Sequence, residues 1–188
     1  MPNLPGAGLQ LEQPIYDTIN LAIAATTGTF FNVPFGGILV GTTTKGYQQT
    51  NLVQASRLET GYTMVVDAIS VWFPETATRQ SEVDIRAVQS GYFQLQIADT
   101  IFLTVPLAMI PNGGAELNLV SNIAAAATEY QLDKGVQATQ NRFYLRQSIT
   151  LNPQQTFKAV IGGFHTAPAA ATQVSCALWG ILTRPVVG

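Results

Sequence analysis

The chain has a single histidine, His165, and a single cysteine, Cys176, which lie eleven positions apart. A structural zinc site takes about four ligands, so these two residues cannot form one within a single chain. His165 follows Gly162-Gly163-Phe164 at an expected strand end, which is typical of a partly exposed loop. Cys176 lies in the apolar run VSCALWGIL, which has no basic neighbour to lower the pKa of a thiol, so we expect it to be buried and unreactive. Neither residue is therefore predicted to be catalytic.

The acidic and glycine-rich segments do not form a recognisable site either. Asp67, Asp84 and Asp99 are isolated, and no segment resembles the D-x-D-x-D-G loop of calcium sites. Asp67 and Trp72 differ by five positions, so in one regular strand their side chains point to opposite faces. The run GGILVGTTTKG at 36–46 lacks the G-x-x-x-x-G-K-[ST] spacing of a phosphate-binding loop and is predicted to be a turn between strands. We predict no enzymatic activity, no catalytic, cofactor-binding or metal-binding residues, and no cofactor.

The composition is unusually poor in charge. Charged residues make up 11% of the chain and apolar residues 47%, whereas a typical soluble domain has about a quarter charged residues. The formal net charge is −2 and the basic residues are scattered, so the sequence predicts no direct binding of nucleic acid. Arg142, Arg146 and Arg184 are expected to pair with carboxylates or to stack at an interface rather than to bind a ligand. Much of the surface must be uncharged, either solvated by Thr, Gln and Asn or covered by other copies of the chain.

The first fourteen residues are predicted to form an arm, 1–14, that precedes one domain over 15–188. Prolines and glycines at positions 2, 5, 6 and 8 disfavour regular structure, whereas Leu4, Leu9 and Leu11 offer apolar side chains for docking. The segment lacks the basic and apolar regions of a signal peptide. No stretch approaches the twenty or so apolar residues of a membrane span, so we expect no transmembrane segment and synthesis in the cytoplasm.

From Tyr16 onward, short segments rich in β-formers alternate with turn residues, a pattern typical of a sandwich or barrel. The clearest hairpin pairs Tyr92–Ile97 with Thr100–Leu107 through a two-residue turn at Ala98-Asp99. Its strict alternation predicts that Phe93, Leu95 and Ile97 face the core. Further strands are expected at 29–33, 37–41, 63–73, 142–151, 156–164 and 173–184. The total is about eight strands, without an internal repeat.

Two segments between the strands have helical character. Ser81 can cap a short helix over 82–89, and Gly91 lies just past its end. The alanine-rich segment 117–130 follows a Pro-Asn-Gly-Gly loop, but its apolar residues do not keep a clean helical period. The sequence therefore predicts an all-β domain with one or two short helices.

The order of these features resembles the jelly-roll structural proteins of icosahedral bacterial viruses, especially capsid and capsid-decorating subunits. The resemblance is carried by strand and turn patterns over about half of the chain, at 50–73, 90–114, 143–161 and 176–188. It implies a single jelly-roll β-sandwich of about eight antiparallel strands. It carries over no functional residue, because such proteins have no active site to match.

The function that this resemblance implies is that of a virion structural protein. Such a chain would be a major or minor capsid protein of a bacteriophage, which self-assembles into an icosahedral shell as a trimer or higher capsomer and contacts other capsid proteins. Its location would be the virion, after synthesis in the host cytoplasm. An alternative within the same class is a decoration or cement protein bound to a finished shell.

An alternative from another class is a carbohydrate- or receptor-binding β-sandwich module. Trp72, Trp179, Tyr62 and Tyr92 would form a sugar platform if they shared one exposed face. Against this reading, Trp179 lies in an apolar strand, where we expect it to be part of the core.

Overall fold

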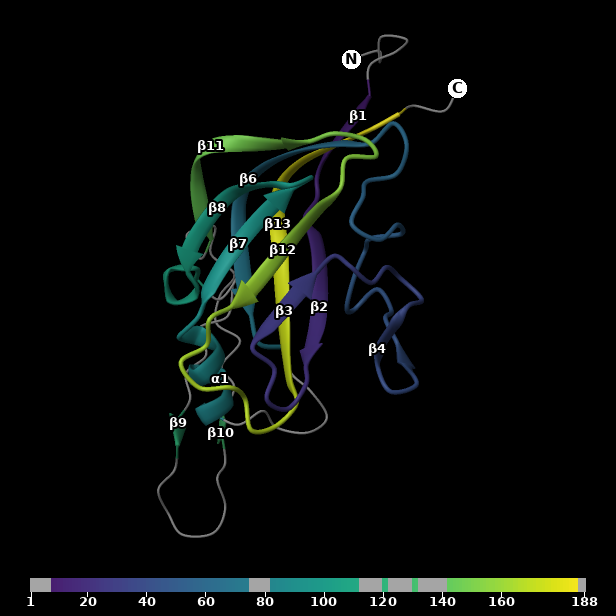
Figure 1. Cartoon of the computed structure of the whole chain (residues 1–188). Coiled ribbons are helices and arrows are strands. Elements are labelled where there is room, and N and C mark those ends of the chain that lie inside the picture. The colour runs from purple at the N-terminus through teal and green to yellow at the C-terminus, as the bar shows by residue number, and fades with distance from the viewer. Residues whose placement is uncertain (1–7, 75–81, 112–119, 122–129, 132–141, 186–188) are drawn as a thin grey trace.

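The computed structural model of the chain describes residues 8–74, 82–111, 120–121, 130–131 and 142–185. Most of these residues lie in antiparallel strands, and the prediction of an all-β chain is confirmed (Figure 1). The larger sheet has five strands: β1 (Leu9–Glu12), β2 (Ile15–Leu21), β6 (Thr63–Trp72), β11 (Phe143–Leu151) and β13 (Thr172–Arg184). The smaller sheet has four strands: β3 (Thr27–Phe30), β7 (Tyr92–Ile97), β8 (Thr100–Pro106) and β12 (Phe157–Gly162).

Strands distant in the sequence are neighbours in both sheets. In the larger sheet β13 lies between β6 and β2, and β11 pairs with the far side of β6. In the smaller sheet the order is β3-β12-β7-β8. Figure 1 shows the smaller sheet in front of the larger one, with β12 and β7 crossing over β13 and β6. The two sheets thus form two stacked layers.

The hydrophobic core fills the space between these layers. The alternating burial of β7 places Phe93, Leu95 and Ile97 in the core, as its sequence pattern predicts. The opposite sheet contributes Met64 and Leu178, among others. Because successive side chains of a strand point to opposite faces, each sheet buries one face and leaves the other free to form a surface.

The β7–β8 hairpin closes through the predicted two-residue turn, since Ile97 pairs with Thr100. Ala98 adopts a left-handed backbone with φ of 50°, which costs a non-glycine residue roughly 1–2 kcal/mol. We therefore expect Ala98→Gly to raise the free energy of unfolding by about 0.5–1 kcal/mol, once the greater entropy of an unfolded glycine is subtracted. Urea denaturation of both proteins measures this gain, and a loss of stability would contradict the turn geometry.

The helix predicted at 82–89 is confirmed as α1 (Glu82–Gln89), and a short 3₁₀ helix, η1 (Leu107–Met109), follows β8. The helix expected over 117–130 is wrong wherever the structure describes that segment. There, β9 (Val120–Ser121) and β10 (Tyr130–Gln131) pair as antiparallel strands. The other residues of 117–130 lie outside the described residues.

The segment expected to be an irregular arm contains a strand. Leu9–Glu12 pair with Arg184 to Ile181 of β13, directly beyond the part of β13 that β2 occupies. The prediction of irregular chain is wrong for these four residues, because the edge of β13 offers backbone groups that an extended segment can satisfy. Residues 1–7 lie outside the described residues.

The segment between β3 and β6 leaves the sandwich and forms a small separate hairpin. It contains β4 (Ile38–Val40) and β5 (Thr43–Thr44), which pair with each other. The strand predicted at 37–41 is therefore confirmed for Ile38–Val40, and Gly41 lies in the turn at a left-handed φ of 55°. Within the described residues, no helix is long and apolar enough to cross a membrane.

Candidate functional site

His165 and Cys176 have the surroundings that their sequence positions predict. His165 is exposed in the loop after β12, where its backbone N–H donates a hydrogen bond to Ser90 Oγ at 2.8 Å. The Cys176 side chain is fully buried in the core, and this burial, with the nearby Asp17 carboxylate, raises the pKa of the thiol well above its ordinary value. A thiol held protonated is a poor nucleophile.

The isolated aspartates have separate structural surroundings. Asp84 is buried at the start of α1, and its Oδ1 accepts a hydrogen bond from the Ala169 N–H at 2.6 Å, which ties the β12–β13 loop to the helix. Asp99 is exposed in the hairpin turn. In the part of the chain that the structure describes, no three His, Cys, Asp or Glu side chains cluster in a way that could hold a metal ion.

A buried ion pair joins β2 to the segment that follows β5. Lys45 Nζ lies 2.6 Å from Asp17 Oδ1, and the two side chains are 2% and 0% exposed. Asp17 Oδ2 also accepts a hydrogen bond from the Phe31 N–H at 2.6 Å. Burial raises the pKa of Asp17 above its ordinary value, against the opposing effect of the Lys45 charge and of these hydrogen bonds. The glycine-rich run 36–46, which contains Lys45, was predicted only as a turn, and nothing in its spacing indicates this buried partner.

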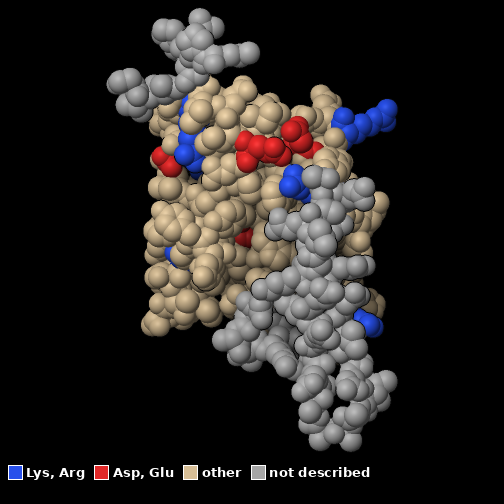
Figure 2. Space-filling model, turned by 180° about the vertical axis from the view of Figure 1, so that it is seen from behind, with Lys and Arg blue, Asp and Glu red and all other residues tan. Residues whose placement is uncertain are grey.

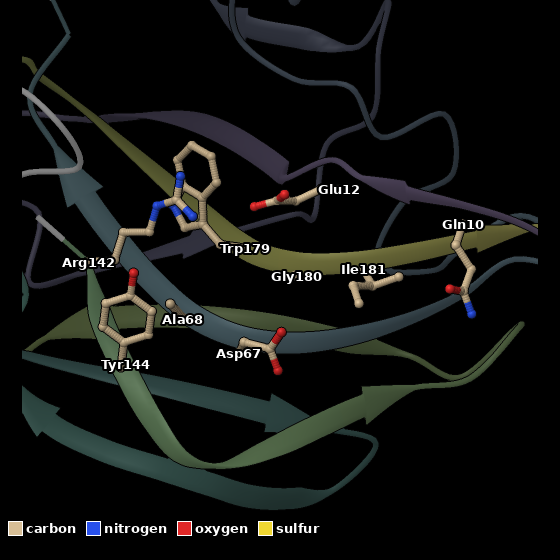
Figure 3. A pocket seen from close by; sticks show the side chains of 9 residues that line it. All are labelled: Gln10, Glu12, Asp67, Ala68, Arg142, Tyr144, Trp179, Gly180 and Ile181. Carbon is tan, nitrogen blue, oxygen red and sulfur yellow. The ribbon is translucent and has the colours of Figure 1, made fainter. Parts of the chain in front are cut away.

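The outer face of the larger sheet carries a groove of about 440 Å³ (Figure 3). Its lining comes from four strands, β1, β6, β11 and β13, and from Arg142 directly before β11, which are brought together only by the sheet. We call it the outer groove; it is lined by Gln10, Glu12, Asp67, Ala68, Arg142, Tyr144, Trp179, Gly180 and Ile181. Figure 2 shows the molecule from this side, where uncharged residues cover most of the described surface, acidic side chains gather in its upper part and basic side chains are scattered.

A β-bulge shapes the floor of the outer groove. Trp179 pairs with Ala68 and Gly180 pairs with Val66, so Asp67 is the extra residue of β6. A Cβ on Gly180, whose φ is 157°, would lie 1.8 Å from the Val65 carbonyl oxygen, so only glycine fits there. Gly180 and Ala68 therefore leave the floor without bulky side chains.

The same bulge overturns the argument that Asp67 and Trp72 point to opposite faces. Asp67 lines the outer groove, and Trp72 pairs with Ser175 and alternates with the core residue Val71. Both residues thus belong to the outer side of β6, because one extra residue shifts the period-2 alternation. Trp72 does not line the groove, so the two residues still do not form a common site.

One wall of the outer groove is a stack of two side chains. The guanidinium carbon of Arg142 lies 3.6 Å from the centre of the Trp179 ring, as Figure 3 shows. The indole Nε1 of Trp179 donates a hydrogen bond to Ser70 Oγ at 2.8 Å, which fixes the ring against the sheet. Trp179 was expected in the core, and this is wrong: it is only half-buried and belongs to the outer face of β13.

Two of the arginines stack on aromatic rings of the same chain, and their stacking at an interface between copies stays a prediction. Arg142 lies on Trp179, and Arg184 lies 5.6 Å from the centre of the Tyr62 ring while its Nη2 donates to Gln13 Oε1 at 2.9 Å. Among the described residues, neither arginine forms an ion pair with a carboxylate. Arg146 is exposed on β11.

The opposite part of the outer groove is acidic. Asp67 Oδ1 accepts a hydrogen bond from Ser148 Oγ at 2.7 Å, and the exposed Glu12 comes from β1. Tyr144 is 56% exposed next to Arg142. Of the four aromatic residues proposed for a sugar platform, only Trp179 lines this groove. Tyr144 was missed, although its i, i+2 spacing from Arg142 in one strand indicates that the two share a face.

No protein-family model, no curated protein and no solved structure matches the chain.

Proposed function

We propose that the two main sheets form a jelly roll. Eight of the strands, taken in chain order, are β2, β3, β6, β7, β8, β11, β12 and β13. The first pairs with the eighth, the second with the seventh, the third with the sixth and the fourth with the fifth, all antiparallel. This nested pairing is what results when one long antiparallel hairpin is wound into two four-stranded layers, as in a jelly roll.

On this basis we infer that the chain is a virion structural protein, a major or minor capsid subunit of a bacterial virus that assembles with copies of itself into an icosahedral shell. The nested strand order is the observation that carries the proposal, since the jelly roll is a recurring fold of viral capsids. Jelly rolls also occur in lectins and cupins, so the fold alone does not indicate a capsid protein. The properties of the surface are therefore needed as further support for this proposal.

The described surface is suited to contacts between copies. Large apolar side chains are exposed near the β7–β8 hairpin, where Ile101 and Phe102 are each 53% exposed and Met109 is 60% exposed. Strand β8 is the edge of its sheet, and its sequence TIFLTVP contains no charged residue that would discourage pairing with another strand. A decoration or cement protein would use the same kind of surface on a finished shell, and is the second form of the proposal.

We expect the purified chain to form a symmetric oligomer, a trimer or a higher assembly. Sedimentation velocity over a concentration series measures its mass, and electron microscopy shows whether shells form. Phe102→Ser should weaken association at least tenfold, because it removes apolar area from the proposed contact. Ile38→Ser on β4 is the matched control, since Ile38 is 63% exposed and β4 lies on the opposite side of the molecule from β8 (Figure 1).

The results of these assembly experiments distinguish a shell subunit from a cement protein. Assembly of the chain by itself supports a shell subunit, whereas binding only to preformed particles supports a cement protein. A chain that stays monomeric at high concentration and binds no particles would contradict both. Equal effects of Phe102→Ser and Ile38→Ser would show that the contact between copies does not involve β8 specifically.

A further inference from the structure

We propose that the outer groove binds a neutral saccharide, a short unit with adjacent hydroxyl groups. The proposal uses only residues of the larger sheet and does not depend on the capsid role. It is argued from the hydrogen-bonding groups, the net charge and the rigidity of the groove.

The groove presents donors at one end and acceptors at the other. The Arg142 guanidinium lies over the Trp179 ring and supplies N–H donors to this part of the groove. Asp67 and Glu12 supply carboxylate oxygens, and Gln10 supplies both a donor and an acceptor. A sugar hydroxyl can both donate and accept a hydrogen bond. A row of sugar hydroxyls can therefore accept from Arg142 and donate to Asp67 and Glu12 at the same time.

The charge of the groove favours a neutral ligand over an acidic one. Two carboxylates, Asp67 and Glu12, face one guanidinium, that of Arg142, among the lining residues. The described lining residues therefore have a formal net charge of −1. A uronic or sialic acid would gain from Arg142 but would meet repulsion from the two carboxylates.

The groove also has apolar surfaces for the C–H faces of a sugar ring. Tyr144 is 56% exposed and Ile181 is 41% exposed, and the floor between them is kept low by Ala68 and Gly180. Aromatic rings with a few converging polar groups are the usual lining of small-ligand sites, and about 440 Å³ lies within their usual range. Figure 3 shows the Tyr144 ring standing beside Arg142 at one end of the groove.

Several of the polar groups are already held in place. Trp179 is fixed by its hydrogen bond to Ser70, Arg142 by its stack on Trp179, and Asp67 by its hydrogen bond from Ser148. A site whose side chains are positioned before binding loses less conformational entropy when the ligand arrives.

The test uses the full chain and a panel of neutral oligosaccharides in gluco, galacto and manno configurations, with uronic-acid and sialylated counterparts. Saturation-transfer NMR detects weak binding, and calorimetry gives the affinity of each positive sugar. We expect at least one neutral sugar to bind. Tyr144→Ala and Asp67→Asn should each lower its affinity at least tenfold, and Arg142→Lys should lower it because the ammonium lacks the planar fork.

Matched controls keep this test specific. Tyr47→Ala removes a tyrosine that is 72% exposed outside the groove, and Asp99→Asn removes an exposed acid in the hairpin turn; neither should change the affinity. Thermal melts confirm that each variant is folded.

Three results would overturn the saccharide proposal: no binding of any panel sugar, binding of acidic sugars alone, or binding that the groove variants leave unchanged. Self-association that is lost in Tyr144→Ala, without any sugar binding, would instead assign the groove to a second copy of the chain. The sedimentation assay with Phe102→Ser tests the capsid proposal separately, so either proposal can fail without the other.

Discussion

Gly180→Ala is expected to cost more than about 4 kcal/mol of folding free energy, the range reached only by severe defects. A Cβ at this position would lie 1.8 Å from the carbonyl oxygen of Val65 and 2.8 Å from its carbonyl carbon. Both are backbone atoms of the neighbouring strand, so they cannot rotate away as a flexible side chain could. The bulge would have to open, and the β6–β13 pairing at the centre of the larger sheet would open with it.

Urea denaturation followed by circular dichroism measures this loss, and Gly46→Ala is the matched control. A Cβ on Gly46 would meet only Gln49 Oε1, at an ordinary distance of 3.5 Å. We expect the control to stay within about 1 kcal/mol of the parent protein. Equal midpoints for the two variants would mean that the bulge does not have the register described here.

Lys45→Met is expected to cost about 3–5 kcal/mol at neutral pH, because it leaves the Asp17 carboxylate buried without its cation. Methionine fills nearly the same volume, so the loss comes from charge rather than from a cavity. The double variant Asp17→Asn with Lys45→Met should lose less than Lys45→Met alone, since the amide oxygen can still accept from the Phe31 N–H. Lys158→Met on the exposed side of β12 should have little effect.

The cost of Lys45→Met should also depend on pH. Burial raises the pKa of Asp17, so the folded protein binds a proton on this carboxylate more tightly than the unfolded chain does. An aspartate in an unfolded chain has a pKa of about 3.9. The contribution of Asp17 to the free energy of unfolding is therefore greatest below about pH 4. It decreases as the pH rises through the pKa that Asp17 has in the folded protein. Removing Lys45 raises that pKa further, so the stability gap between parent and variant should narrow as the pH falls from about 7 towards 4. A gap that widens on acidification would contradict this account.

The features that were predicted correctly depend on neighbouring residues in the chain. The strict alternation of YFQLQI was enough to place Phe93, Leu95 and Ile97 in the core, and Ala98-Asp99 marked the turn. The helix at 82–89 was indicated by its length and its flanking Ser81 and Gly91. The expected burial of Cys176 followed from the apolar run around it. In each case the period of the local pattern carries the information.

The outer groove could not be found in this way. Its residues come from four strands, and they share a face only because β13 pairs with both β1 and β6 while β11 pairs with β6. The extra residue Asp67 reverses the alternation halfway along β6, which is why the sequence pattern misplaced Asp67 relative to Trp72. Trp179 was assigned to the core for a similar reason: an apolar strand does not indicate which of its two faces is covered.

By itself, the sequence determined that the chain folds as a mostly β protein that is poor in charged residues. These properties follow from composition and from the two-residue period of a strand, which are local. Only the tertiary structure decided the nested strand order, the ion pair between Lys45 and Asp17, and the meeting of Arg142 with Trp179. Those contacts depend on which strands pair and in what register, and a single bulged residue is enough to change the side chains that face one another.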